Sequence, residues 1–277
     1  MPGHSKVGKS GYTTECKWEH LDGMKAEEAF VEEFLDACAA GDLSNTQEAI
    51  SSGRLTVEDL DEGLKLATEE ARPEIVTALF DAGARATSAI SWLTGEQREL
   101  PGIIRQFFDH GLDPNATSNG EPLLCLLSTP ESAREFLLRG ADPNRCSPRG
   151  ASPLMRAISS TCEEDPSLFE LLLAHGAKLE PHLLFKAIAP RLRQGEFMTK
   201  YLLAKGLDIN MTHEIWGSPL HRAITYSKLS IIKLLVDAGA DRTARPAGTP
   251  YHDESPLEFA ERSERSDKEA ILSLLRS

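Results

Sequence analysis

Residues 3–10, GHSKVGKS, match the phosphate-binding pattern G-x-x-x-x-G-K-[ST]. The fixed positions are occupied by Gly3, Gly8, Lys9 and Ser10. Such a loop binds phosphate when a buried strand delivers it to a helix N-terminus, where free amides and the helix dipole meet the anion. Only two residues precede the match, and a segment with a glycine and two threonines follows it, so neither the strand nor the helix is expected. We therefore interpret residues 1–25 as a flexible N-terminal segment and expect no nucleotide or other cofactor.

The other residue types that carry chemistry show no catalytic or metal-binding spacing. The eight histidines include no H-E-x-x-H, the five cysteines include no C-x-x-C pair, and no G-x-S-x-G elbow is present. The acidic run Glu163-Glu164-Asp165 is typical of a solvated turn. We predict no catalytic residue and no metal site, and an odd number of scattered cysteines favours reduced thiols over a disulfide framework.

Charge is distributed unevenly along the 277 residues, whose formal net charge is −13. Residues 1–100 hold 9 Lys and Arg against 20 Asp and Glu, whereas residues 101–277 hold 21 against 23. An acidic chain repels nucleic acids and anionic lipids, so neither is expected as a partner. No apolar run approaches the roughly 18 residues of a membrane span, and no secretory signal is visible, so we expect a cytoplasmic or nuclear protein.

A repeated glycine organises the elements that must position any functional residue. Each glycine follows an apolar helical stretch, and the intervals between successive ones are 30, 28, 29, 36, 30 and 33 residues. A glycine at this position is typical of a left-handed helix C-cap. The glycines are Gly53, Gly83, Gly111, Gly140, Gly176, Gly206 and Gly239.

A second marker, Pro-Leu, predicts the start of another helix in several of these repeats. Proline in the first helical turn costs no hydrogen bond, and a preceding serine can cap the free amides. Ser152, Ser218 and Ser255 precede such prolines, and Pro122 lies in a similar segment, GEPLLCLL. The predicted unit is therefore helix, turn, helix, glycine and loop.

The segment GSPLHRAITYSKLSIIKLLVDAGAD (217–241) resembles the ankyrin repeat, whose signature is T-P-L-H-x-A followed by L-L-x-x-G-A-D. Ser replaces Thr in the first part. Residues 141–176 and 207–239 match well, 177–206 keep the helices without the signature, and 26–111 match mainly by spacing. The resemblance implies an all-α solenoid of about seven to eight helix-turn-helix units over residues 26–277, and it implies a structural role for His221.

Ankyrin-like arrays generally bind partner proteins with their concave face and the hairpin tips that join repeats, which is what the resemblance implies here. The tip at residues 210–217 carries large apolar groups, although its tryptophan can instead fold back on a neighbouring repeat. Arginines beside it form a candidate basic strip, with surface solubility as the competing explanation. The candidate partner-binding residues are Trp216, Met211, His213, Ile215, Arg222, Tyr226, Arg145, Arg149 and Arg156.

These observations favour a monomeric, non-enzymatic scaffold or adaptor that binds a partner protein. One alternative is an acidic ankyrin-type assembly chaperone for a basic partner, which the charge of residues 1–100 favours. Another is a divergent enzyme that acts on a small molecule in the groove, which requires titratable groups to converge in one pocket.

Overall fold

The computed structural model describes residues 14–94, 100–160, 164–190, 192–246, 251 and 253–277. The chain forms two compact units, the first comprising residues 1–93 and 100–112 and the second residues 94–99 and 113–277. The phosphate-loop match at residues 3–10 and Glu163 of the acidic run lie outside the described residues.

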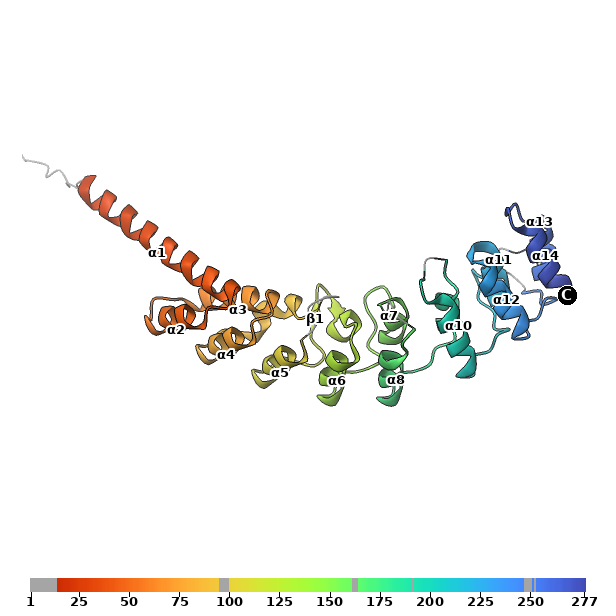
Figure 1. Ribbon diagram of the computed structural model, residues 1–277, viewed down its shortest axis with the longest axis horizontal. Helices are drawn as coiled ribbons and strands as arrows, with labels where there is room; N and C mark the ends of the chain where they lie inside the picture. The colour runs from red at the N-terminus through yellow and green to blue at the C-terminus, as the bar shows by residue number, and fades with distance from the viewer. Residues whose placement is uncertain (1–13, 95–99, 161–163, 191, 247–250, 252) are drawn as a thin grey trace, which may run out of the picture. The chain divides into compact units, whose positions relative to one another are not determined.

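The first unit is helical throughout its described part. α1 packs against α2 and α3, and α3 packs against α4 and η1. Figure 1 labels α1 to α4, which are drawn from red to orange. The elements of the first unit are α1 (Thr14–Ala40), α2 (Leu43–Ser51), α3 (Val57–Glu69), α4 (Pro73–Asp81), the 3₁₀-helix η1 (Ala86–Trp92) and α5 (Pro101–Asp109).

α1 is longer than the helix that the sequence predicts at the start of the array. The expected boundary between residues 25 and 26 falls inside this helix, which begins at Thr14. Phe34 and Cys38 of α1 are buried, whereas Glu28, Glu32 and Glu33 are exposed, so one face of this terminal helix lies in solvent. The flexibility of residues 1–13 stays a prediction.

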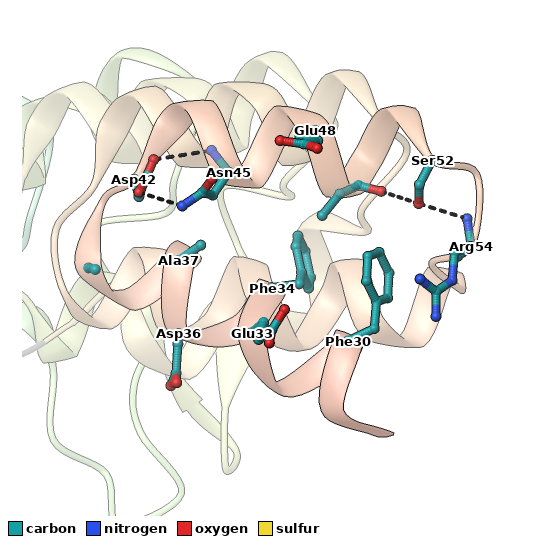
Figure 2. A pocket seen from close by; sticks show the side chains of 12 residues that line it. Phe30, Glu33, Phe34, Asp36, Ala37, Asp42, Asn45, Glu48, Ser52 and Arg54 are labelled. Atoms are coloured by element: carbon teal, nitrogen blue, oxygen red, sulfur yellow. Dashed lines mark hydrogen bonds between the residues drawn. The ribbon is translucent and has the colours of Figure 1, made fainter. Parts of the chain in front are cut away.

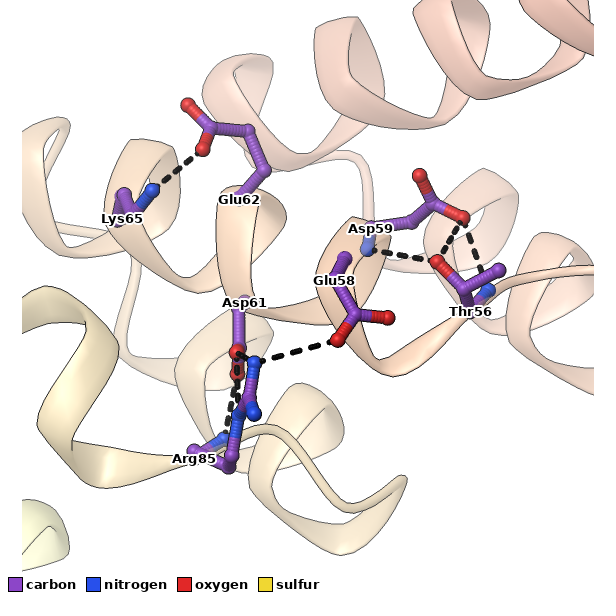
Figure 3. Close-up of polar contacts among 7 residues, drawn as sticks. All are labelled: Thr56, Glu58, Asp59, Asp61, Glu62, Lys65 and Arg85. Carbon is purple, nitrogen blue, oxygen red and sulfur yellow. Dashed lines mark hydrogen bonds and ion pairs between the residues drawn. The ribbon is translucent and has the colours of Figure 1, made fainter.

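A buried carboxylate joins α3 to the segment that enters η1 (Figure 3). Asp61 is 5% exposed, and it accepts hydrogen bonds from the backbone N–H and from Nε of Arg85, both at 2.7 Å. At the N-terminus of the same helix, Thr56 and Asp59 form a capping box, in which each side chain accepts a hydrogen bond from the other residue's backbone N–H. These bonds satisfy amides that a helix start leaves without partners.

The second unit consists mainly of helix pairs, drawn from green to blue in Figure 1. α7 packs against α8 and α9, and α11 packs against α12 and α13. Its elements are β1 (Thr117–Ser118), β2 (Glu121–Pro122), the 3₁₀-helix η2 (Leu123–Leu126), α6 (Pro130–Leu138), α7 (Pro153–Ser160), α8 (Ser167–Ala174), α9 (Leu183–Ala187), α10 (Gly195–Ala204), α11 (Pro219–Tyr226), α12 (Leu229–Asp237), α13 (Pro256–Arg262) and α14 (Lys268–Arg276).

The glycine that ends each repeat adopts the left-handed conformation that the sequence predicts. Gly53, Gly83, Gly111, Gly140, Gly176, Gly206 and Gly239 have φ between +68° and +103°. A Cβ at any of these positions would meet no atom within 4 Å, so backbone conformation rather than space requires glycine there.

The serine caps are confirmed, but one predicted helix start is not. Ser152, Ser218 and Ser255 each accept a hydrogen bond from the amide three residues later. In contrast, Pro122 ends a two-stranded hairpin and leads only into the 3₁₀-helix η2. Pro130 already begins α6, so the chain between the two prolines is too short for a full α-helix and its turn.

Candidate partner-binding surface

The tip at residues 210–217 is closed by its own backbone. The N–H of His213 donates to the carbonyl of Gly217 at 2.9 Å, and the N–H of Gly217 donates back at the same distance. Nδ1 of His213 accepts from the N–H of Ile215 at 3.1 Å. The tip is therefore a fixed turn at the N-terminal end of α11.

Trp216 of this tip is half-buried and packs within the array. The centroid of its ring lies 4.2 Å from the centroid of the His213 imidazole, in a stacked arrangement. The same centroid lies 5.4 Å from that of the Phe185 ring in α9. The guanidinium carbon of Arg222 lies 3.9 Å from the tryptophan centroid, in a cation–π arrangement. These contacts favour the interpretation in which the ring folds back on a neighbouring repeat, and its role in partner binding stays a prediction.

Arg222 is held at the base of the tip. Its Nε donates to the carbonyl of Phe185 at 3.0 Å, which joins α11 to α9. Burial lowers the pKa of Arg222, yet an arginine remains charged at neutral pH. The structure therefore supplies a fixed, partly desolvated cation beside Trp216.

The residues left for a partner to contact are those around this packed centre. Ile215 is 62% exposed and Tyr226, one helical turn after Arg222, is 58% exposed. Met211 is partly buried against the core formed by α11, α12 and α14. Of the large apolar or aromatic candidates in this region, Ile215 and Tyr226 are thus the ones that face solvent.

The predicted basic strip is largely occupied by contacts within the repeats. Arg145 donates to the carbonyl of Asn115, and Arg156 forms an ion pair with Glu121 at 3.1 Å. Arg149 is exposed in the 144–150 tip. A continuous strip that joins these three arginines to Arg222 stays a prediction.

A pocket of about 330 Å³ lies beside Trp216 and contains residues that the sequence analysis missed. Its lining adds Met155 of α7, His182, and Lys186 of α9 to His213, Trp216 and Arg222. The new residues come from two preceding repeats, one of which lacks the Thr-Pro-Leu-His signature. The signal available in the sequence was the spacing of four residues between His182 and Lys186. In the helix Leu183–Ala187 and its N-cap, this spacing places the two residues one turn apart.

His221 has the structural role that the ankyrin resemblance implies. Its Nδ1 accepts from the N–H of Ser218 at 3.3 Å, and its Nε2 lies 3.1 Å from the carbonyl of Glu254. An accepting Nδ1 places the proton on Nε2, which then donates to that carbonyl. Burial lowers the pKa of the imidazole, and the ring joins α11 to the segment before α13.

In the first unit, a groove of about 770 Å³ runs between α1 and α2 (Figure 2). Glu33 and Asp36 line it from α1 and Glu48 from α2, and all three are exposed. The rings of Phe30 and Phe34 lie between the two helices. Acidic side chains outnumber basic ones in this groove, which Arg54 also lines with its guanidinium carbon 3.7 Å from the centroid of the Phe30 ring.

Within the described ranges, no group of three or more His, Cys, Asp or Glu side chains is placed to hold a metal ion. Nor does any helix in that part of the chain combine the length and hydropathy of a membrane span.

Comparison with known sequences identifies the repeats. A family model described as ankyrin repeats in many copies matches residues 184–247. The 2-5A-dependent ribonuclease of the mouse, Mus musculus, is 29% identical over 112 residues. That alignment covers 39% of this chain and 13% of the ribonuclease, so the chain corresponds to a small part of that protein.

One solved structure agrees with the sequence match, and a second is reported beside it. The human ASB11 ankyrin repeat domain is 25% identical with a TM-score of 0.51, over 64% of this chain and 77% of that domain. The ankyrin repeat domain of Bcl-3, a member of the IkappaB family, is 23% identical with a TM-score of 0.44, over 88% of this chain and 98% of that domain.

The predicted fold class, an all-α ankyrin-repeat solenoid, is confirmed by the helix pairs together with these matches. Ankyrin repeats generally mediate protein–protein interaction, and scaffolds built from them are typically non-enzymatic. The chain therefore contains ankyrin repeats, which the family model matches over residues 184–247, and its helix pairs have the ankyrin-repeat fold.

Proposed function

We propose that the protein is a non-enzymatic scaffold or adaptor that binds a partner protein through the 210–217 tip and the exposed side of α11. The observation that carries this proposal is the exposure of Ile215 and Tyr226 beside a tip that is already fixed by hydrogen bonds and ring packing. Exposed large apolar side chains on a rigid element are typical of protein-binding surfaces.

Rigidity gives this surface its binding mechanism. His213, Trp216 and Arg222 hold one another in place before any partner arrives. A preorganised surface loses little conformational entropy on binding, so a larger part of the contact energy appears as affinity. No chemical step is required, and the protein acts by holding its partner.

The test is affinity purification with mass spectrometry, followed by a dissociation constant for the recovered partner. We expect Ile215→Ser with Tyr226→Ser to weaken binding at least tenfold, because a truncated anchor costs about 2 kcal/mol or more. Leu138→Ser is the matched control, since Leu138 of α6 is 65% exposed and lies away from the tip in sequence. Equal binding by the wild type and the double variant, with unchanged melting temperatures, contradicts the proposal.

A second candidate, the acidic assembly chaperone for a basic partner, is favoured by the grooves of the first unit. The α1–α2 groove combines Glu33, Asp36 and Glu48 with the aromatic rings of Phe30 and Phe34. Another groove of about 560 Å³ along α1 is lined by Glu27, Glu28, Glu32 and Asp59 around Val31 and Leu35. Both suit a segment that carries basic and apolar side chains.

A further inference from the structure

The pocket beside Trp216 concentrates positive charge in a small volume. Its lining consists of Met155, His182, Lys186, His213, Trp216 and Arg222, and it contains no carboxylate. All six residues belong to the second unit. The side chains of Lys186 and Arg222 are both partly buried, so water screens their charges less than it screens those of fully exposed residues.

Neither cation of the pocket is neutralised by an acidic side chain in the described part of the chain. Arg222 makes its contacts with a carbonyl oxygen and with the tryptophan ring, and Lys186 has no ion pair among the described residues. Glu180 contacts His182 at 3.3 Å, and it also accepts a hydrogen bond from Ser152 at 3.1 Å. Two adjacent cations without a carboxylate create a positive potential that an anion can satisfy.

The tryptophan does not offer a stacking face to an aromatic ligand. His213 stacks at 4.2 Å from its centroid, and the guanidinium carbon of Arg222 lies at 3.9 Å. Two groups this close to one centroid must occupy opposite faces, because they would collide on the same face. The ring therefore acts as an apolar wall, and the pocket suits a small anionic group rather than a nucleobase or another flat ring.

We propose that this pocket binds the carboxylate of an aspartate or glutamate side chain of the partner protein. Because Phe185 accepts the Nε–H of Arg222, the terminal N–H groups of the guanidinium remain for the two oxygens of one carboxylate. Lys186 adds a second charge from α9. Ile215 lies in the tip and Tyr226 lies on α11, so apolar residues are expected to flank the acidic residue in the bound segment.

This inference rests on the proposed function and adds the chemistry of the partner. The two ideas make separate predictions, since the exposed residues Ile215 and Tyr226 contribute apolar contact while the pocket recognises charge. A charged pair held in a partly buried site contributes to orientation and specificity as well as to affinity.

The first experiment is selection from a random decapeptide display library on the full-length protein. We expect selected peptides to share an Asp or Glu between apolar residues, and we expect the Lys186→Gln variant to lose this preference. Lys228→Gln is the matched control, because it removes an exposed cation just after α11 that does not line the pocket. Selection of peptides without a shared acidic position overturns the inference.

The second experiment measures synthetic versions of one selected peptide by calorimetry. The glutamate peptide is expected to bind at least tenfold more tightly than its glutamine version, and this difference is expected to vanish in both Lys186→Gln and Arg222→Gln. Lys186→Gln leaves the Arg222–Phe185 hydrogen bond in place, so its result does not depend on whether Arg222→Gln folds. A phosphoserine version that binds while the glutamate version does not overturns the carboxylate assignment.

The failures of the two proposals are distinguishable. If the glutamate and glutamine peptides bind equally and Ile215→Ser with Tyr226→Ser still abolishes binding, the carboxylate pocket is wrong and the protein-binding surface stands. If that double variant binds both peptides as the wild type does, the protein-binding surface itself is wrong.

Discussion

At the scale of single residues, His221 makes the stability of the folded protein depend on pH. Burial lowers its pKa in the folded protein, so the unfolded chain takes up a proton more readily than the folded chain does. The contribution of this neutral imidazole to stability is therefore complete above the unfolded pKa of about 6.5 and is lost as the pH falls below it.

The free energy of unfolding is measured by urea titration at pH 7.5 and at pH 5.5, which lie about one unit on either side of the ordinary histidine pKa. We expect the decrease between these two pH values to be smaller in His221→Gln than in the wild type. His175→Gln is the control, because it removes an exposed histidine at the end of α8 by the same substitution. Identical pH dependence in His221→Gln and the wild type contradicts the assigned role.

The reactivity of each cysteine thiol depends on its own burial. Burial raises the pKa of Cys38 to about 11 and that of Cys125 to about 12, whereas Cys146 is exposed. The thiolate is the reactive form, so a buried thiol of raised pKa reacts slowly. In a background with Cys16 and Cys162 replaced by serine, we expect Cys146 to react rapidly with dithiobisnitrobenzoate and the other two thiols to react after denaturation. Rapid reaction that persists in Cys146→Ser contradicts this order.

At the scale of elements, the 210–217 tip and α11 form one packed unit. Trp216 contacts Phe185 of α9 and Arg222 of α11, and it packs against the core of the adjoining repeats. Its removal therefore loses contacts between three elements, whereas Ile215 is mainly exposed to solvent.

We expect Trp216→Ala to lower the free energy of unfolding by about 1–3 kcal/mol, as is usual when packed side-chain contacts are lost. Ile215→Ala is the matched comparison from the same turn, and it should cost less than about 0.5 kcal/mol, as expected for an exposed position. Urea titrations of the two variants provide the measurement. Equal losses in the two variants would mean that the ring packing does not stabilise the repeat.

The sequence predicts the repeat elements better than the surface between them. The glycines at the helix ends and the serine caps follow from backbone and hydrogen-bond requirements that are local in sequence, and the structure has them. The 3₁₀-helix after Pro122 departs from the pattern because Pro130 follows too soon. The pocket formed by Met155, Lys186 and Arg222 requires three helices to be stacked in a known register, which a single-sequence pattern does not supply.

At the scale of the whole molecule, the two compact units differ in the partners that their surfaces suit. The grooves of the first unit are lined mainly by acidic and apolar side chains, whereas the pocket beside Trp216 in the second unit contains two cations, Lys186 and Arg222, and no carboxylate. A scaffold gains specificity when separate surfaces attract segments of opposite charge. The two proposals together assign an acidic segment to the second unit and a basic segment to the first unit as binding partners.

The acidic grooves predict association that depends on salt. Glu33, Asp36 and Glu48 line the α1–α2 groove and have no ion pair among the described side chains, so their charges are available to a basic segment. We expect a decapeptide amide of alternating lysines and leucines to bind the full-length protein with an association rate that falls as salt rises from about 20 to 150 mM, because salt screens exposed charges within about 8 Å at the higher concentration.

The location of this attraction is tested with two triple variants that change the net charge equally. Glu33→Gln, Asp36→Asn and Glu48→Gln neutralise the groove, whereas Glu131→Gln, Asp237→Asn and Glu264→Gln neutralise exposed acids of the second unit. We expect stopped-flow measurements to show a slower association and a weaker salt dependence in the groove variant than in the other one. If both variants slow the peptide equally, the attraction comes from net charge alone, and the groove does not select a basic partner.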